Sequence, residues 1–301
     1  MKQMKRILSV MLTGAMVCAT LVVSKPAEAK KSTYWMHTVA THYSLRDGKW
    51  EKTNVDKDKY DNKGRHTEHS FSSATGNKSK TVYKYKNGNH VKSIYYSNGK
   101  KASSTRYAYD KKGNMKEYSE YDAKGKLIHT TTITNDMKGF PCKYVKIYAD
   151  KSKKKEITTI KSTYKSGKVV KRVSKHTADG ETKTTTSTFT YYKNGNTHTS
   201  KEKGPDSLYE YEYDSKGRII KHSSSTKYAK SETIYEYNKK GDTSKSVSKY
   251  TSQSGITNES TTVYSYKYDK NGNISECVEN VNGVDTLKTV YTGYKKITVS
   301  K

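Results

Sequence analysis

The sequence is poor in the residues from which a large apolar core is built. Val, Ile, Leu and Phe together make up roughly one residue in eight after residue 29, a level typical of disordered chains. The chain also holds only 3 Pro and 3 Cys, but it holds 28 Tyr. Disordered tails are rich in proline and poor in aromatic residues. The composition therefore favours a folded protein, provided that the tyrosines follow a regular pattern.

The first residues have the features of an export signal. A positively charged start precedes an apolar run over 7–23, and the AEA at 27–29 places small residues where a signal peptidase reads them. We predict cleavage after Ala29 and a secreted, extracellular protein. The run is short for a membrane span and no second one follows, so we expect no transmembrane segment after cleavage. The lysine-led signal and the scarcity of cysteine favour a Gram-positive source.

Tyrosines recur at every second position, which is the period of a β-strand with one aromatic and one polar face. These runs are Tyr83/Tyr85, Tyr107/Tyr109, Tyr209/Tyr211/Tyr213, Tyr235/Tyr237 and Tyr264/Tyr266/Tyr268. A turn follows each run, as in YDSKG at 213–217 or YKNG at 85–88. Asp or Asn opens such a turn and Gly closes it, because glycine takes a positive φ without steric cost. Turns about a dozen residues apart predict consecutive antiparallel hairpins.

We therefore predict an all-β protein, an antiparallel β-meander of repeated hairpins that forms an elongated or spiralling single sheet. Its segments are a signal peptide at 1–29, an N-terminal cap segment at 30–55 that holds both tryptophans, and a hairpin repeat array at 56–301. With few aliphatic residues, stabilisation must come from tyrosine packing between neighbouring strands rather than from one large core. An irregular all-β domain with ordinary hairpins is the alternative.

Three stretches carry a family resemblance: YEYDSKGRIIKHSS, YAYDKKGNMKEYSEYDAKGKLI and YSYKYDKNGNISE. They resemble the YD repeats of the Rhs family, in which Tyr-x-Tyr-Asp is followed by two residues, Gly-Arg or Gly-Asn, and an aliphatic residue. The copies YYSNGKK and YKNGN are similar, more weakly, to MORN-like repeats. The resemblance implies a spiralling β-sheet, often a shell around a toxic C-terminal domain. Related repeats occur in surface proteins implicated in carbohydrate or partner binding.

The chain departs from the toxin-delivery members of that family. It is much shorter, its repeats run to the end, and its three prolines cannot supply the proline-containing motif that closes an Rhs core. We therefore carry over only the repeat fold, and neither encapsulation nor toxicity.

Catalytic residues are not predicted. A glycosidase needs two carboxylates in one cleft, but the repeated acids all open turns, where Asp accepts backbone hydrogen bonds. These acids are Asp61, Asp110, Asp122, Asp214 and Asp269. We predict that the protein is not an enzyme. An envelope hydrolase would need acids, or a histidine and an acid, that meet in a cleft.

No metal site or cofactor is predicted either. His66 and His69 do not form a His-Glu-x-x-His motif, and we expect His37 and His42 to lie on opposite faces of a strand. The acids of DKDKYDNKG at 56–64 are spaced wrongly for a calcium loop. We interpret all of these as solvated surface residues.

Cys142 and Cys277 are the cysteines that follow the signal. Export permits a disulfide, but in a linear array these residues should lie many strands apart. A bond between them would require the sheet to curl back on itself and close.

Positive charge is the clearest indication of function. The chain has a net charge of +29, and removal of residues 1–29, which hold four Lys/Arg and one Glu, leaves +26. Rows of lysine on a sheet attract polyanions. We predict a secreted, envelope-associated protein that binds glycans or anionic wall polymers such as teichoic acids, held non-covalently at the cell wall. Cations beside tyrosines also suit single-stranded DNA, but nothing resembles a base-reading module, so nucleic acid is not the expected ligand. The candidate binding residues are Tyr209, Tyr211, Tyr213, Tyr264, Tyr266, Tyr268, Lys111, Lys112, Lys216, Lys239 and Lys240.

Two alternatives stay open. The charge could serve only to keep a two-faced sheet soluble and to block edge pairing. The protein could instead be a secreted effector or a protein-binding component of an Rhs-type toxin system, with another envelope protein as its partner.

Overall fold

The computed structural model describes residues 31–300 as antiparallel strands joined by tight turns, with no helix in that range. The predicted signal peptide at 1–29 lies outside the described residues. The first half of the chain forms β1 (Lys31–Met36), β2 (Val39–Arg46), β3 (Lys49–Tyr60), β4 (His66–Ser73), β5 (Lys78–Lys86), β6 (Asn89–Ser97), β7 (Lys100–Tyr109), β8 (Met115–Asp122), β9 (Leu127–Asn135), β10 (Pro141–Tyr148) and β11 (Glu156–Lys165). The second half forms β12 (Lys168–Ala178), β13 (Glu181–Tyr191), β14 (Thr197–Lys203), β15 (Ser207–Tyr213), β16 (Ile219–Thr226), β17 (Ala229–Tyr237), β18 (Thr243–Ser252), β19 (Thr257–Tyr268), β20 (Ile274–Val281), β21 (Val284–Thr292) and β22 (Lys295–Ser300).

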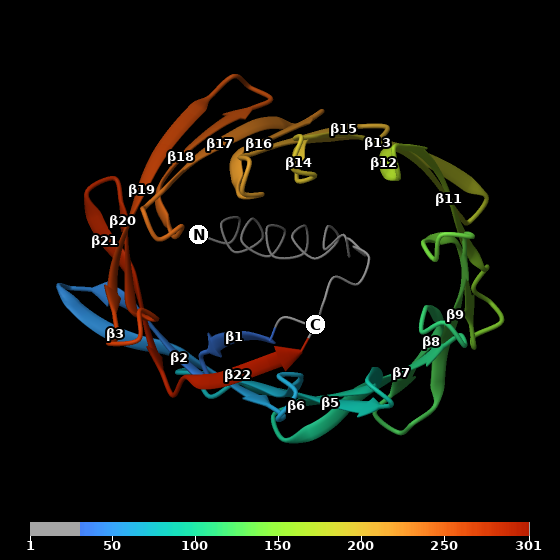
Figure 1. Ribbon diagram of the computed structural model, residues 1–301, viewed down its shortest axis with the longest axis horizontal. Coiled ribbons are helices and arrows are strands. Elements are labelled where there is room, and N and C mark those ends of the chain that lie inside the picture. The colour runs from blue at the N-terminus through green and yellow to red at the C-terminus, as the bar shows by residue number, and fades with distance from the viewer. Residues whose placement is uncertain (1–30, 301) are drawn as a thin grey trace.

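The all-β, antiparallel architecture is confirmed, but the prediction of an elongated or spiralling single sheet is wrong. Strands β2 to β21 form a closed barrel of 20 strands within the described chain (Figure 1). Closure occurs where β2 pairs with β21, from Val39 opposite Thr292 to Ser44 opposite Leu287. Strand twist accumulates around a sheet until its two edges meet, and closure removes both exposed edges. The sequence pattern predicts each hairpin, but it does not predict this pairing between the first and last strands of the barrel.

The hairpin turns have the predicted chemistry. Gly113 closes the turn after Asp110 with a φ of 84°, and its N–H donates to the Asp110 carbonyl at 3.1 Å. In the shorter turns, two consecutive residues have positive φ, as at Asn87 (51°) and Gly88 (82°). Such turns match the twist of the strands that they join. Local sequence thus fixes where each hairpin bends.

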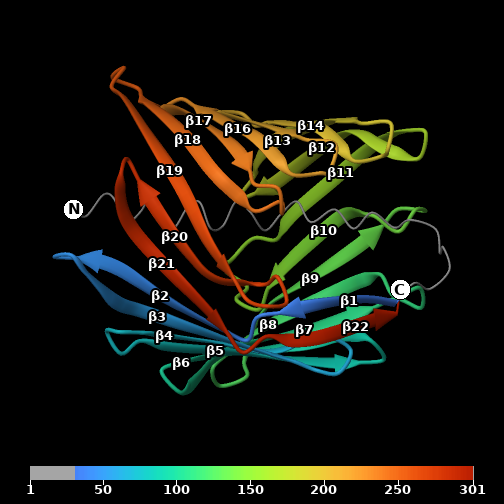
Figure 2. The same cartoon turned by 60° about the vertical axis from the view of Figure 1, so that its left-hand side comes forward.

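A second, two-stranded sheet lies inside the ring. Strand β1 pairs with β22, and Figures 1 and 2 show this small sheet against the inner side of the barrel wall. The predicted cap segment at 30–55 therefore contributes β1, β2 and the first half of β3, with Trp35 in β1 and Trp50 in β3. Lys295 of β22 attaches the small sheet to the wall, because its Nζ donates to the carbonyl oxygen of Tyr60 at 2.7 Å.

The barrel has very little apolar core. Among the described side chains, the buried hydrophobic ones are Ala40, Val55 and Ile297, and no large side chain is fully buried. Several buried groups are polar, including Ser119 and Thr131. Stability therefore depends on the strand ladders and on contacts between neighbouring strands, as in other architectures in which each unit contacts only its neighbours.

No helix of the described residues combines the length and the apolar character that crossing a membrane requires.

Candidate functional site

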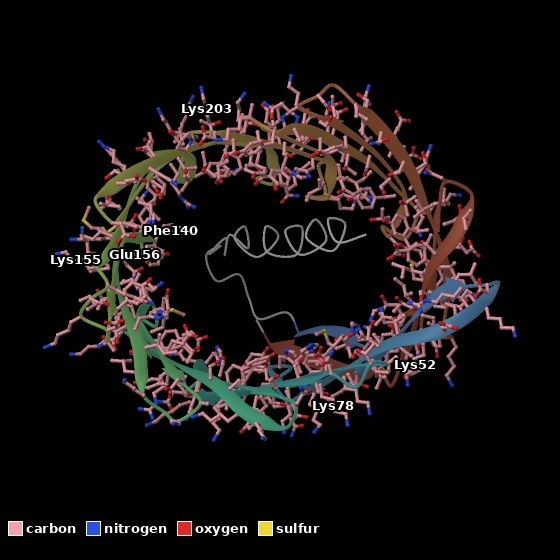
Figure 3. All side chains as sticks on the ribbon, turned by 180° about the vertical axis from the view of Figure 1, so that it is seen from behind. Lys52, Lys78, Phe140, Lys155, Glu156 and Lys203 are labelled. Carbon is pink, nitrogen blue, oxygen red and sulfur yellow. The ribbon has the colours of Figure 1, made fainter. Side chains whose placement is uncertain are left out.

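The two faces of the barrel wall carry different chemistry. Lys203 points outward in Figure 3, so Lys201, two residues earlier on β14, shares the outer face. Lys201 pairs in register with Glu210 of β15, and their side chains form an ion pair at 2.8 Å. Tyr209 and Tyr211 alternate with Glu210 and therefore face the interior. On β14 and β15, lysine and glutamate thus occupy the outer face, and tyrosine occupies the inner one.

The same division of the two faces holds on β3, β4 and β5, next to the strand pair that closes the barrel. Lys78 points outward in Figure 3 and pairs with Ser72 of β4, which places Glu68 on the outer face as well. Glu68 forms an ion pair with Lys59 at 2.8 Å. On the opposite face of the same strands lie Asp58 and His69, which are paired in register. Glu68 is therefore neutralised by a cross-strand lysine.

Each YD motif forms one structural unit. Asp214 accepts backbone N–H groups of Lys216 and Arg218, both at 2.9 Å, and the Arg218 guanidinium lies 2.6 Å from the same carboxylate. Partial burial opposes ionisation, but these hydrogen bonds outweigh it and lower the pKa of Asp214. The predicted turn role of the repeated acids is confirmed, because Asp61, Asp110, Asp122 and Asp269 accept turn N–H groups in the same way.

Several tyrosines of the inner face join neighbouring hairpins. The Tyr237 hydroxyl donates to the carbonyl oxygen of Ile219, the first residue after the preceding YD turn, at 2.5 Å. The Arg218 guanidinium lies over the same ring, 4.3 Å from its centroid. Equivalent hydroxyl-to-carbonyl bonds are Tyr85 to His66, Tyr109 to His90, Tyr191 to Val169, Tyr266 to Thr243 and Tyr294 to Ile274. Tyr, Asp, Gly and Arg of the motif thus have separate structural roles.

The predicted lysines all lie on one rim of the barrel. In an antiparallel meander, turns that follow odd-numbered strands lie at one end, and we call the end formed by the turns after β3 to β19 the lysine rim. Lys111 and Lys112 lie in the turn after β7, Lys216 in the turn after β15, and Lys239 and Lys240 in the turn after β17. All five are exposed, and none forms an ion pair with a described residue.

The predicted tyrosines lie on the inner face and do not form one pocket. Tyr209, Tyr211 and Tyr213 are on β15, whereas Tyr264, Tyr266 and Tyr268 are on β19, four strands away. The Tyr211 ring stacks on His222, with centroids 4.5 Å apart and planes at 15°. The two groups of predicted residues meet at the lysine rim, where Lys240 Nζ lies 3.3 Å from the centroid of the Tyr268 ring. Tyrosine and lysine side chains therefore come close together at the rim, although the predicted tyrosines lie on the inner face of the strands and the predicted lysines lie in the turns.

The electrostatics of the inner tyrosines follow from their burial. Burial and the nearby Cys277 raise the pKa of Tyr266. Burial also raises the pKa of Tyr268, with a further contribution from its hydrogen bond to Asp242 at 2.7 Å. These hydroxyls therefore stay neutral at physiological pH and act as hydrogen-bond donors within the wall.

A histidine and aspartate cluster lies on the inner face of β3 and β4, which sequence reasoning missed. Asp58 Oδ1 lies 2.7 Å from His66 Nε2 and 2.9 Å from His69 Nδ1. His37 Nε2 lies 3.9 Å from Asp58 Oδ2. The Asp58 side chain is only 11% exposed, so its interpretation as a solvated surface residue is wrong.

The same cluster extends to the strand that closes the barrel. His42 of β2 lies 3.1 Å from Asp56, and Asp56 lies 3.5 Å from His69. The expectation that His37 and His42 point to opposite faces of one strand is wrong, because β2 begins after His37, at Val39. Both histidines reach inner carboxylates of β3. The spacing of DKDKY offered a signal, since alternate acids of a strand share a face.

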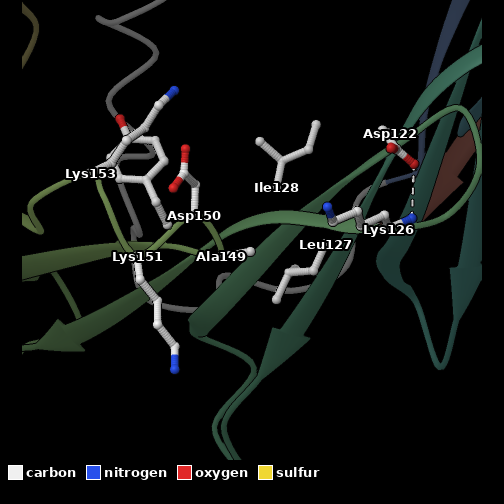
Figure 4. A pocket seen from close by; sticks show the side chains of 9 residues that line it. Asp122, Lys126, Leu127, Ile128, Ala149, Asp150, Lys151 and Lys153 are labelled. Atoms are coloured by element: carbon white, nitrogen blue, oxygen red, sulfur yellow. Dashed lines mark hydrogen bonds between the residues drawn. The ribbon is translucent and has the colours of Figure 1, made fainter.

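A shallow depression lies at the opposite rim (Figure 4). It is lined by Leu127 and Ile128 of β9, by Tyr148 at the end of β10, and by the turns that adjoin them. The Lys126 N–H donates to Asp122 across its edge at 2.8 Å. None of the predicted binding residues lines this depression, and its two carboxylates, Asp122 and Asp150, accept backbone N–H groups of their turns.

The two cysteines are free in the structure. The barrel therefore closes without a disulfide between Cys142 and Cys277. Burial raises the pKa of the Cys277 thiol to about 11.

No family model and no curated protein matches the sequence. A solved porin-like protein from Bacteroides uniformis ATCC 8492 is 14% identical, with a TM-score of 0.35 over 85% of this chain and 96% of that one. A porin-like protein from Bacteroides vulgatus ATCC 8482 is 11% identical, with a TM-score of 0.36 over 85% of this chain and 97% of that one. The TcdB2-TccC3 crystal structure is 13% identical, with a TM-score of 0.31 over 87% of this chain and 19% of that one. Likenesses this weak do not bear on function.

Proposed function

We propose that the protein is a secreted, non-enzymatic binding protein that attaches to anionic polymers of the cell envelope through the lysine rim. The observation that carries this proposal is the position of Lys111, Lys112, Lys216, Lys239 and Lys240. All five are exposed on the same rim, and none forms an ion pair with a described residue. We further infer that the hairpin unit is a YD-type repeat. Its turn exposes lysine side chains, while its aspartate accepts hydrogen bonds from the backbone N–H groups of the turn.

Distances between turns favour binding to a chain of charges. Neighbouring turns of the rim are two strands apart, or about 10 Å. The Debye length at physiological salt is about 8 Å, so the potentials of adjacent turns overlap. A flexible polyanion that lies along the rim would contact several turns at once and release counterions at each. Teichoic acid, a chain of phosphate diesters, has the required chemistry.

The outer wall contributes less to binding than the rim. Its lysines are partly matched by cross-strand glutamates, as in the ion pair of Lys267 and Glu276 at 2.7 Å. On the inner face, tyrosine hydroxyls are engaged with backbone carbonyls. Tyr268, whose ring lies next to the rim and contacts Lys240, is the predicted tyrosine nearest to a polymer bound there.

The test is a binding titration of the purified protein with fluorescently labelled teichoic acid. The rim variant replaces Lys111, Lys112, Lys216 and Lys239 by Gln, and it leaves Lys240 in place because that side chain stacks on Tyr268. We expect the rim variant to bind at least ten times more weakly than the unmodified protein, because four cations of one surface are lost.

A matched control removes the same charge from the outer wall. Lys161, Lys171, Lys175 and Lys249 are exposed, lie within strands, and form no ion pair with a described residue. Their replacement by Gln should weaken binding much less than the rim variant does. Equal weakening by the two variants would show that total charge, not the rim, governs binding. No binding by the unmodified protein would refute the proposal and favour a protein partner.

A further inference from the structure

The cluster on β3 and β4 has the ligand set of a transition-metal site. Asp58, His66 and His69 each offer one ligand atom, and these three atoms all lie within 4.8 Å of one another. Two imidazole nitrogens and one carboxylate oxygen suit Zn²⁺, whereas Ca²⁺ and Mg²⁺ prefer oxygen ligands alone. We propose that Asp58, His66 and His69 bind a divalent transition-metal ion of the Zn²⁺ class.

The distances fit insertion of an ion with only small side-chain movements. With bonds of about 2.0–2.1 Å, two ligands of a tetrahedral zinc site lie about 3.3 Å apart. Asp58 Oδ1 is 2.7 Å from His66 Nε2 and 2.9 Å from His69 Nδ1. These pairs need to open by roughly half an ångström to reach the tetrahedral separation. The third pair, His66 Nε2 and His69 Nδ1, lies within 4.8 Å.

One nitrogen of the cluster lacks a satisfactory partner. His66 Nε2 is buried and makes no hydrogen bond of acceptable geometry with a described residue, although Asp58 Oδ1 is close. An unsatisfied buried polar atom costs free energy and is rare in folded proteins. A metal ion placed between His66, His69 and Asp58 would satisfy this nitrogen and the shared carboxylate oxygen together.

Surrounding groups provide the outer shell that such sites have. The Nδ1 atom of His69 contacts Asp58, and its Nε2 atom lies 3.5 Å from the Asp56 carboxylate. A carboxylate on the second ring nitrogen orients a histidine ligand and makes it more basic. His42 contacts Asp56 at 3.1 Å and also lies 3.0 Å from the Thr289 hydroxyl of β21. The proposed site is therefore connected to the strand pair that closes the barrel.

A fourth ligand is within reach. His37 Nε2 lies 3.9 Å from Asp58 Oδ2, and His37 occupies the link between β1 and β2. Its side chain is 42% exposed and lies edge-on to the Tyr291 ring, with centroids 5.1 Å apart. Coordination by His37 would attach the small inner sheet to the barrel wall. Metal binding should therefore raise thermal stability as well as occupy the site.

The test uses Zn²⁺ and Co²⁺ themselves as probes of the purified protein after treatment with a chelator. We expect one equivalent of Co²⁺ to give the visible absorption of a tetrahedral site, which Zn²⁺ then displaces. His66→Ala and His69→Ala should each abolish this absorption. Asp56→Asn should keep the site but weaken binding about 10- to 100-fold, because it removes only the orienting carboxylate.

The matched control is His198→Ala, which removes an exposed histidine on β14, far from the cluster in the strand order. It should bind Co²⁺ as the unmodified protein does. Circular dichroism must show that each variant keeps its β-sheet, and His69→Gln replaces His69→Ala if the latter does not fold. Absence of Co²⁺ absorption in the unmodified protein would overturn the proposal, and so would equal Co²⁺ binding by His66→Ala. Neither result depends on polymer binding at the rim.

Discussion

Replacement of Tyr109 by Phe tests whether the motif tyrosines join neighbouring hairpins. The Tyr109 hydroxyl donates to the His90 carbonyl oxygen at 2.8 Å, and burial raises the pKa of this tyrosine. Phe keeps the ring and removes only the hydrogen bond, which contributes about 0.5–1.5 kcal/mol. With a urea m-value of about 2–3 kcal/mol/M, a loss of about 1 kcal/mol lowers the unfolding midpoint by about 0.3–0.5 M.

The assay is urea unfolding followed by circular dichroism, with Tyr250→Phe as the matched control. Tyr250 is 44% exposed, and its hydroxyl makes no hydrogen bond with a described residue. Its replacement should change the free energy of unfolding by less than about 0.5 kcal/mol. If Tyr109→Phe and Tyr250→Phe shift the midpoint equally, the hydroxyl-to-carbonyl bonds do not stabilise the barrel and the reasoning is refuted.

Three further predictions concern the turns, the inner face and the thiol. Gly113 has a φ of 84°, so Gly113→Ala should lower the free energy of unfolding by about 1–2 kcal/mol in the same urea assay; an unchanged midpoint would contradict this. Burial raises the pKa of Tyr294 from 10.0 to about 12, so the folded state keeps a proton that the unfolded state loses. Stability should therefore be full below about pH 10 and fall as the pH rises toward 12, measured by thermal unfolding against pH, and a flat profile would oppose it. Burial of the Cys277 thiol, with a pKa of about 11, should make its alkylation slower in the folded than in the urea-unfolded protein, and equal rates would contradict the structure.

Sequence alone specified the hairpins well. The alternation of Tyr209, Tyr211 and Tyr213 sets the two faces of β15, and Asp214 with Gly217 sets the turn that follows. Both signals are local, because a strand period and a turn residue act within a few positions of each other. The positions of the turn lysines follow from the same pattern. Their common edge follows from the antiparallel meander, and closure makes that edge a ring.

Closure and the inner cluster could not be predicted from local patterns. The pairing of Val39 with Thr292 joins residues from the two ends of the barrel, and no motif marks either strand as a partner of the other. Contact between Asp58 and His66 depends on the register shift between Lys59 and Tyr60, which places His66 opposite Tyr60 and on the inner face. A β-bulge of this kind moves side chains from one face to the other. Reading each histidine on its own strand therefore missed the cluster.

Attachment to anionic polymers through the lysine rim is most directly tested by its salt dependence. The measurement is the affinity for purified teichoic acid over a series of salt concentrations, for the unmodified protein and for the variant with Gln at Lys111, Lys112, Lys216 and Lys239. Each phosphate contact should contribute about 0.7 to the slope of log affinity against log salt, as for flexible single strands. We predict a steep negative slope that becomes shallower by up to about three in the variant. Equal slopes for the two proteins, or binding that does not change with salt, would contradict the proposed function.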